Sequence, residues 1–167
     1  NERILVAFWP RGGVPEAATG MSVSAYLAER LWKPLGMESP ALWALDREGG
    51  TEKAFCCVSA RARDFARLGR LFLDSGRWNG RQVVPAEWAE RHVIAGIRTD
   101  DGYLHHHLWW EPPGNEGDFY AYGHNGQYLY VNPASRVVIV KFSETMRQDP
   151  VPMFRAISAS LRDPLHL

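Results

Sequence analysis

The chain has 167 residues, of which 46% are hydrophobic and 23% charged, with 19 basic and 19 acidic side chains. This length and apolar content suffice for one domain with a hydrophobic core. The balanced charge argues against a nucleic-acid-binding surface and a polybasic membrane patch, and no apolar run is long enough for a transmembrane helix. We therefore expect its partners to be small molecules or other proteins, and neither nucleic acid nor membrane.

The first periodic segment predicts a helix over residues 22–32, because apolar side chains recur there at helical spacing. Ser22 is the expected N-cap. Pro34 prevents continuation, since proline lacks an amide donor and clashes with the preceding turn. Residues 45–53 are charged and rich in glycine, so we expect a surface loop.

Two more helices are predicted in the middle of the chain. Residues 59–74 place apolar side chains on one face and four arginines outside it, with Ser59 as the expected N-cap. Gly76 ends this helix, and residues 78–85 form a turn and a short extended piece. A third helix is expected from Ala86 to about Ile94.

The last third of the sequence changes to strand patterns. Alternating or continuous apolar runs predict strands over residues 104–110, 119–122, 127–131 and 137–142, followed by an amphipathic helix over 151–161. Helices followed by antiparallel strands and a final helix indicate the α+β class.

A β-hairpin is predicted where the segment Tyr122-Gly123-His124-Asn125-Gly126-Gln127 leads into the next strand, which turns again at Asn132-Pro133. Glycine at two positions lets the backbone approach a neighbouring group closely and exposes its amides.

Four segments resemble, in the same order, the β-lactamase-related serine hydrolases, and in particular the branch with class C-like esterases and aminohexanoate-dimer hydrolases. They are Ala18-Thr19-Gly20-Met21-Ser22 with Pro34-Leu35-Gly36-Met37, the segment Ser59 to Gly69 with Gly76-Arg77-Trp78-Asn79-Gly80, Trp109-Trp110, and Gly123 to Pro133. The resemblance implies the C-terminal part of the β-lactamase/transpeptidase-like fold over residues 16–167, preceded by an atypical segment over residues 1–15.

The resemblance also implies site residues. The family's His-x-Gly or Lys-x-Gly signature lines the active site, and the amide after its glycine forms half of an oxyanion hole. In this chain it corresponds to His124, Asn125, Gly126 and the amide of Gln127. The alternative interpretation is a plain hairpin turn that carries a surface histidine.

The nucleophile signature Ser-x-x-Lys does not occur in this sequence. The positions three residues before the lysines Lys33, Lys53 and Lys141 hold Arg30, Gly50 and Val138. A Tyr-x-Asn pattern occurs at Tyr130-Val131-Asn132, but it lies within the hairpin and is interpreted as coincidence. We therefore expect a piece of a hydrolase whose N-terminal half is encoded elsewhere.

These observations leave two main functions open. One is a serine hydrolase of small-molecule amide or ester substrates, without a cofactor, to which this chain contributes the oxyanion strand and pocket wall once an N-terminal half completes it. The other is a non-catalytic remnant or protein-interaction module, in which an exposed sheet edge could support self-association.

A metal site is a third and weaker alternative. It would be built from His105, His106 and His107 with His92 or His124. On a strand His105 and His107 share one face and His106 lies on the other, and no carboxylate stands at ligand spacing. We expect no metal ligands here.

Two smaller features have structural interpretations. Cys56 and Cys57 are adjacent, so we expect two small buried apolar residues and no ordinary disulfide. Asp64 and Arg67 are three positions apart on a predicted helix, and we interpret them as a surface pair that ties the helix to its surroundings.

Overall fold

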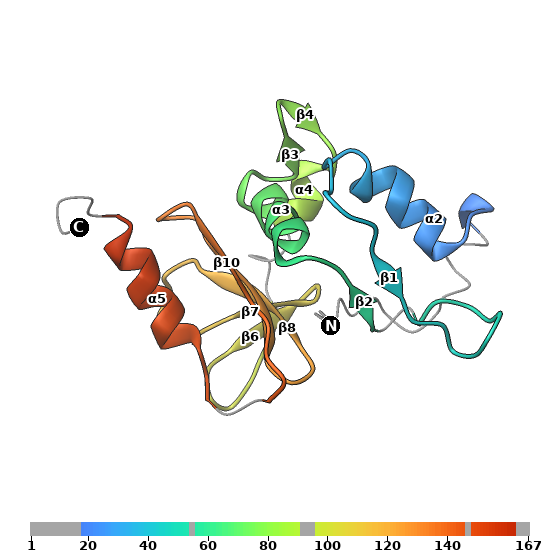
Figure 1. Ribbon diagram of the computed structural model, residues 1–167. Coiled ribbons are helices and arrows are strands. Elements are labelled where there is room, and N and C mark those ends of the chain that lie inside the picture. Colours follow the sequence, from blue (N-terminus) through green and yellow to red (C-terminus); the bar gives the residue numbers. More distant parts are fainter. Residues whose placement is uncertain (1–17, 54–55, 91–95, 146–147, 163–167) are drawn as a thin grey trace.

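The computed structural model describes residues 18–53, 56–90, 96–145 and 148–162. The atypical segment predicted over residues 1–15 lies outside the described residues. In the described part, short helices and strands come first, a long helix crosses the middle of the molecule, and a sheet followed by a final helix completes it (Figure 1). The predicted α+β class is confirmed. None of the described helices combines the length and apolar character needed to cross a membrane.

A six-stranded antiparallel sheet forms the centre, with strand order β10-β9-β8-β7-β6-β5. Because each strand pairs with its neighbour in the chain, the sheet is a simple meander of hairpins. Its strands are β5 (Ile97–Arg98), β6 (Leu104–His106), β7 (Trp109–Glu111), β8 (Phe119–Gly123), β9 (Gln127–Asn132) and β10 (Val137–Lys141).

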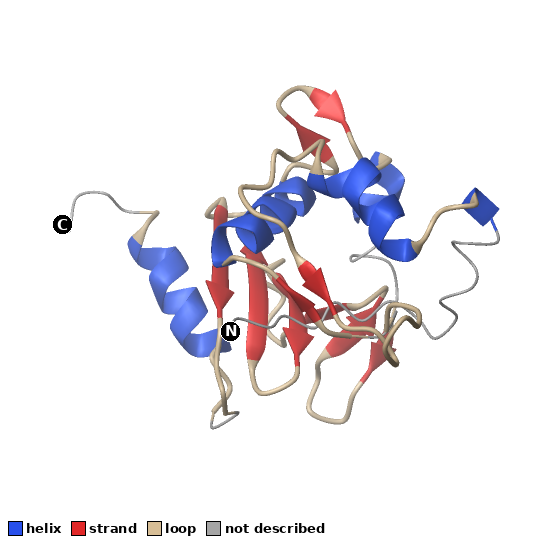
Figure 2. Ribbon diagram, turned by 45° about the vertical axis from the view of Figure 1, so that its right-hand side comes forward, coloured by secondary structure: helices blue, strands red, loops and turns tan. Residues whose placement is uncertain are grey.

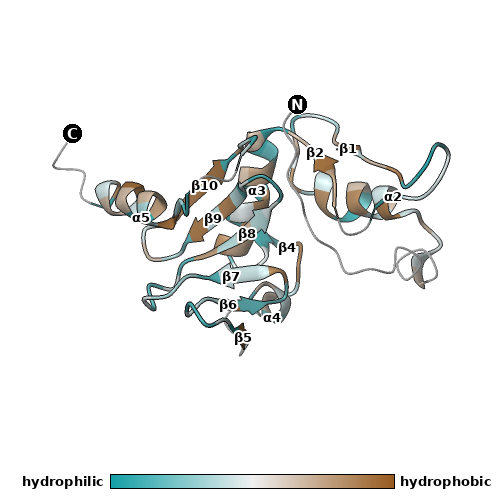
Figure 3. Ribbon diagram, turned by 90° about the horizontal axis from the view of Figure 1, so that it is seen from below, coloured by the Kyte–Doolittle hydropathy of each residue, from teal (hydrophilic) through white to brown (hydrophobic). Residues whose placement is uncertain are grey.

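Helix α3 (Ala62–Leu73) packs against one face of β9 and β10. The contact is apolar: Leu68 and Phe72 meet Leu129, Val131 and Val138. Hydrophobic residues colour much of β9 and β10 in Figure 3. Burial of these side chains holds α3 on the sheet.

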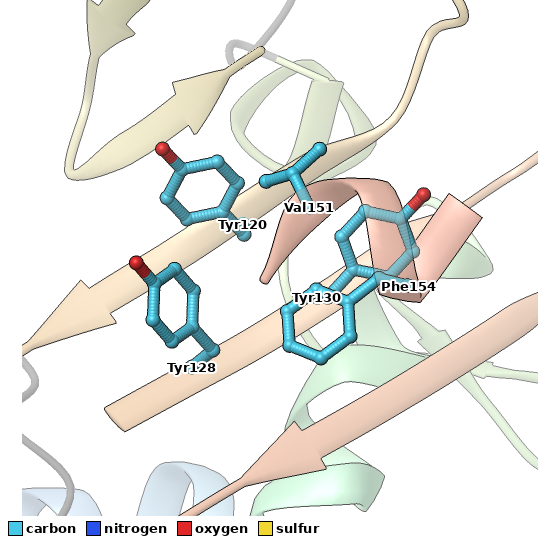
Figure 4. Packing of buried hydrophobic residues seen from close by; sticks show 5 residues of the cluster. All are labelled: Tyr120, Tyr128, Tyr130, Val151 and Phe154. Atoms are coloured by element: carbon cyan, nitrogen blue, oxygen red, sulfur yellow. The ribbon is translucent and has the colours of Figure 1, made fainter. Parts of the chain in front are cut away.

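Helix α5 (Val151–Ser160) covers the opposite face of the sheet (Figures 1 and 2). Here Val151 and Phe154 pack on tyrosines of β8 and β9, as Figure 4 shows. An ion pair adds to the contact, because Arg155 donates to both carboxylate oxygens of buried Asp118, with N–O distances of 2.8 Å.

A smaller layer precedes α3. It comprises α2 (Val23–Leu27), a π-helical turn η1 (Ala28–Trp32), and the paired strands β1 (Leu42–Trp43) and β2 (Val58–Ser59). The Ser22 hydroxyl accepts a hydrogen bond from the Ala25 amide, which confirms the predicted N-cap. Val58 of β2 and Phe65 of α3 form a buried hydrophobic cluster. Trp32 and Trp43 of this layer and Phe142 beyond β10 pack against it.

In chain order, α3 is followed by the hairpin β3 (Arg77–Trp78) and β4 (Arg81–Gln82) and by the short helix α4 (Ala86–Ala89), before the sheet begins. The turn and short extended piece predicted over residues 78–85 correspond to this hairpin and the residues that follow it. The predicted end of the third helix falls on residues 91–95, which lie outside the described residues.

Two predicted elements differ from the structure. Helix α3 begins after Arg61, and Ser59 instead pairs with Leu42 in β2, so the prediction of Ser59 as N-cap is wrong. Residues 104–110 are a hairpin and not one strand. His107 and Leu108 reverse the chain with φ of 47° and 73°, a left-handed conformation that non-glycine residues rarely adopt and that no glycine signals here.

The interpretation of the two cysteines is also corrected. Cys56 and Cys57 are joined by a disulfide between neighbouring residues. Cys57 has a φ of 78°, and its carbonyl accepts from the Ala44 amide. The pair therefore stabilises a local turn next to β2, and it closes no long loop.

Asp64 is not part of a surface pair. Its side chain is fully buried and accepts a hydrogen bond of 2.7 Å from the Glu38 amide, while the Arg67 guanidinium lies 3.9 Å away. The carboxylate thus fixes the chain after η1 to the first turn of α3, which agrees with the predicted structural role but places it in the interior.

Candidate active site

The predicted site residues lie at the tip of the β8–β9 hairpin. His124, Asn125 and Gly126 connect the strands, and the Gly126 amide donates to the Gly123 carbonyl at 3.2 Å. Asn125 and Gly126 have φ of 61° and 81°. Asparagine and glycine are the residues that adopt this conformation most readily, which explains why they stand at this turn. The motif therefore occupies a tight turn and not the body of a strand.

Exposure divides the four residues into two pairs. His124 and Asn125 are exposed, whereas Gly126 and Gln127 are buried. The first pair can contact a ligand directly with its side chains. The second pair belongs to the supporting structure beneath them.

Ser143 holds both polar atoms of the Gln127 side chain. Its Nε2 donates to the Ser143 carbonyl, and its Oε1 accepts from the Ser143 amide at 3.1 Å. Because both polar side-chain atoms are bonded and the residue is only 6% exposed, Gln127 anchors the turn to the chain that follows β10.

Lys141 supports the turn from the neighbouring strand. Its Nζ donates to the Gly126 carbonyl at 3.1 Å and lies 5.8 Å from the centre of the Tyr128 ring. In the sequence, Lys141 is a lysine without a serine three residues before it, and no local pattern indicates another role. Its contact arises from the register of β9 and β10, in which Lys141 is opposite Tyr128, and no local pattern signals that register.

The same contact orients the Gly126–Gln127 peptide. The chain has no cis peptide among its described residues, so this peptide is trans and its N–H points opposite to its C=O. With the carbonyl directed to Lys141 in β10, the Gln127 amide is directed to β8, where Gly123 is its register partner. Its role as an oxyanion donor stays a prediction.

Tyrosines lie next to the turn on the face of the sheet that carries α5. The rings of Tyr122 and Tyr128 are 5.1 Å apart, and those of Tyr120 and Tyr128 are 5.3 Å apart. Burial, with smaller contributions from Tyr122 and Asp149, raises the pKa of Tyr128 to about 12. At neutral pH this hydroxyl is protonated, so it can donate a hydrogen bond but does not serve as a general base.

The three consecutive histidines are not brought together. His105 stacks on Trp110, His106 lies with Nε2 3.1 Å from Glu111 Oε1, and His107 faces the Trp88 ring. Glu111 is a carboxylate neighbour that the spacing of the sequence did not indicate. Among the described residues, no group of three or more histidine, cysteine, aspartate or glutamate side chains is placed to hold a metal ion. His92 lies outside them.

Tyr130 and Asn132 take part in a buried network away from the turn. The Tyr130 hydroxyl donates to Asp118 Oδ2 at 2.8 Å and accepts from Asn132 Nδ2 at 3.1 Å. Asp118 is also the partner of Arg155, so the Tyr-x-Asn pattern here links β9 to α5. This agrees with its interpretation as a coincidental match.

Comparison with known proteins assigns the family. The beta-lactamase family matches residues 12–161 of this chain. A 6-aminohexanoate-dimer hydrolase from Paenarthrobacter ureafaciens is 33% identical over 140 residues, which are 78% of this chain and 36% of that protein. The chain thus spans about a third of the length of this relative.

Two solved structures agree. One, described as "putative 6-aminohexanoate-dimer hydrolase" from Bacillus anthracis, superposes with a TM-score of 0.81 at 31% identity, over 90% of this chain and 41% of that chain. The other, a "putative beta-lactamase" from Bacteroides dorei, shares the fold with a TM-score of 0.63 at 16% identity, over 91% of this chain and 55% of its own. The chain therefore belongs to the beta-lactamase family and has the β-lactamase/transpeptidase-like fold.

Proposed function

We propose that the protein is a serine-type hydrolase of small amide or ester substrates, and that this chain contributes one wall of its active site. The observation that carries the proposal is the β8–β9 turn. It presents His124 and Asn125 to solvent, while Lys141 and Ser143 hold Gly126 and Gln127 beneath them. A rigid turn with exposed polar side chains suits substrate positioning, because positioning depends on groups that do not move.

The nucleophile of such a hydrolase lies outside this 167-residue sequence, which contains no Ser-x-x-Lys. Acyl transfer needs a serine whose proton an adjacent base accepts, and the family supplies that base as the lysine of Ser-x-x-Lys. Because the chain matches about a third of its relative, we propose that residues encoded elsewhere complete the site. A short amide, like that named for the relative, is the substrate class to test first.

The DNA upstream of this sequence provides the first test. We expect one of its three reading frames to encode Ser-x-x-Lys and a tyrosine signature. Their absence from all three frames would contradict the proposal that a second half completes the site.

Activity provides the second test. We expect the isolated chain to show no saturable turnover of a p-nitrophenyl ester, a chromogenic β-lactam or a linear amide dimer, because loss of the nucleophile removes most catalysis. In the completed protein, His124→Ala and Asn125→Ala should lower kcat/KM about 10-fold or more, whereas the surface control Arg47→Ala should leave it unchanged. Repurified isolated chain that still turns over substrate would refute the division of the site.

The second candidate is a non-catalytic interaction module. The specific observation is β10, which ends the described sheet with four apolar residues and one lysine. Such an edge offers backbone donors and acceptors to another strand, including that of a second copy. Light scattering tests this candidate: a concentration-dependent dimer favours self-association, and a monomer at all concentrations opposes it.

A further inference from the structure

Two Asn-Gly pairs occupy hairpin turns in the described part of the chain. Asn79-Gly80 joins β3 to β4, and Asn125-Gly126 lies in the β8–β9 turn. In each pair both residues have a positive φ, with values of 47° and 82° in the first and 61° and 81° in the second. Asparagine and glycine suit such turns, because both tolerate this conformation. The two pairs therefore share sequence and the sign of φ, and they differ in their surroundings.

The pair in the β8–β9 turn is firmly held. Gly126 is buried, and its amide donates to the Gly123 carbonyl at 3.2 Å. The Gly126 carbonyl accepts from Lys141 Nζ at 3.1 Å. The strands on either side of this turn pair from Gly123 and Gln127 along their full lengths. Gly126 is thus fixed at both its amide and its carbonyl, and it is shielded from water.

The pair between β3 and β4 has the opposite surroundings. Asn79 and Gly80 are both exposed, and their hairpin projects from the molecule (Figures 1 and 2). Among the described residues, neither the Gly80 amide nor the Asn79 side chain has a hydrogen-bond partner. A Cβ built on Gly80 would meet no atom within 4 Å. Each strand of this hairpin has two residues, so the turn opens at a low cost in free energy.

An open Asn-Gly turn is chemically reactive. The Gly80 nitrogen can form a bond to Asn79 Cγ while the Cγ–Nδ2 bond breaks, and ammonia leaves with the amide proton. Water then opens the five-membered imide at either of its carbonyls, which leaves aspartate or its isoaspartyl isomer. Glycine favours the attack, because no Cβ shields its nitrogen and its backbone rotates readily. The reaction consumes only water and needs no cofactor.

Local charge assists this reaction at both turns. The attacking nitrogen must lose its proton, and a nearby cation favours the deprotonated form. Arg77 supplies that charge at the first turn, since its Nη2 donates to the Gly80 carbonyl at 2.9 Å. Lys141 supplies a similar charge at the Gly126 carbonyl. Charge therefore does not distinguish the two pairs, whereas burial and the hydrogen bond of the attacking amide do.

We propose that Asn79 is a site of spontaneous deamidation and isoaspartate formation, and that the β8–β9 turn protects Asn125 from the same reaction. The isoaspartyl product lengthens the backbone by a methylene group, so Trp78 and Arg81 no longer pair across a two-residue turn. Because the Trp78 ring centre lies 4.9 Å from the Arg70 guanidinium, this change also alters a contact with α3. The modification is independent of the hydrolytic function proposed above.

Peptide mass analysis of the ageing chain tests the proposal. The full 167-residue chain is incubated at neutral pH, and samples are digested with chymotrypsin, which releases residues 79–88 and 123–128. The peptide with Asn79 should acquire the mass increase of deamidation about tenfold faster than the peptide with Asn125, because only the first turn opens easily. Equal rates, or faster reaction at Asn125, would overturn the proposal.

The same experiment in urea separates the effect of the fold from that of the flanking residues. In the unfolded chain both glycine amides are exposed, so the two rates should agree within about twofold. If the tenfold difference persists in urea, the neighbouring residues decide it and the protection assigned to the β8–β9 turn is wrong.

Two matched variants locate the product. Isoaspartate in the aged, folded chain is labelled with an isoaspartyl carboxyl methyltransferase and a radioactive methyl donor. Asn79→Gln should remove most of the label, because glutamine forms the larger imide ring slowly, whereas Asn125→Gln should leave the label within about twofold. The reverse pattern would contradict the proposal. So would deamidation at Asn79 that yields aspartate alone, because the imide opens to both isomers.

Discussion

The two faces of the central sheet are held by different forces. The face toward α3 is purely apolar at its centre, with Leu129, Val131 and Val138 against Leu68 and Phe72. The face toward α5 combines aromatic packing with a buried ion pair between Asp118 and Arg155. The apolar face tolerates any side chains of suitable volume, whereas the α5 face requires particular partners at particular distances.

This difference bears on the candidate site. The β8–β9 turn extends from the same strands, and Lys141 and Tyr128 beside it belong to the α5 face. Positioning of the turn therefore depends on polar contacts as well as on burial. Three substitutions and a change of pH would show whether the two faces differ in this way.

Loss of the Asp118 charge should have the largest effect. Asp118→Asn removes the buried charge that pairs with Arg155, and breaking a buried pair costs about 3–5 kcal/mol. We expect about 3 kcal/mol in urea unfolding, because Arg155 is still 21% exposed and regains some hydration. Glu116→Gln, which alters a carboxylate 3.5 Å from Arg155 that is 47% exposed, should change stability by less than about 0.5 kcal/mol. Equal effects would show that burial does not distinguish the two carboxylates.

Removal of the Tyr130 hydroxyl tests the same network without changing its charge. Tyr130→Phe leaves Asn132 Nδ2 without its acceptor in the interior, which should cost about 1–3 kcal/mol. Urea unfolding measures the loss, and Tyr26→Phe at a position 37% exposed is the control. A cost no larger than that of the control would mean that aromatic packing alone holds this face.

An added methyl group tests the apolar face. A Cβ at Gly69 would lie 2.6 Å from Val138 Cγ1 and 2.8 Å from Leu129 Cδ1. Such overpacking costs about 1–3 kcal/mol, offset by about 1 kcal/mol of helix propensity. We expect Gly69→Ala to destabilise by about 1 kcal/mol. In a Val138→Ala background the substitution should become neutral or stabilising, and a cost that persists there would place the strain elsewhere.

Alkaline pH should weaken the α5 face through its tyrosines. Burial, aided by the hydrogen bond to Asp149, raises the pKa of Tyr103 to about 12. The folded protein therefore retains this proton above the ordinary tyrosine pKa of about 10. The stabilising contribution is fully present below pH 10 and is lost as the pH rises through about 12.

Absorbance at 295 nm during an alkaline titration measures this effect. Tyr103→Phe should remove one tyrosine from the high-pH step and reduce the fall in stability above pH 10. A high-pH step of unchanged amplitude in this variant, with the loss in the step near pH 10 instead, would show that Tyr103 ionises with the exposed tyrosines.

Local patterns predicted most elements because local chemistry forms them. Strand alternation placed β8, β9 and β10 within a residue or two, and the Ser22 hydroxyl capped its helix as expected. Prediction failed where a distant partner decided the structure, or where a turn had no residue that marks it. Ser59 pairs with Leu42 and is not a cap, and the turn at His107 and Leu108 has no glycine to mark it.

The candidate site shows the same division. The resemblance selected His124, Asn125, Gly126 and Gln127, and the structure places all four at one turn. Local sequence could not reveal that Lys141 holds the Gly126 carbonyl or that Ser143 holds the Gln127 side chain, because both contacts cross between strands.

The fold class, the family resemblance and the position of the turn could be predicted from the sequence, because periodicity and short motifs along the chain indicate them. The burial of two carboxylates with distant partners follows from the tertiary structure alone: Asp64 accepts from the Glu38 amide, and Asp118 pairs with Arg155. These pairings join residues far apart in the chain. Their energies depend on distance and burial, which no local pattern encodes.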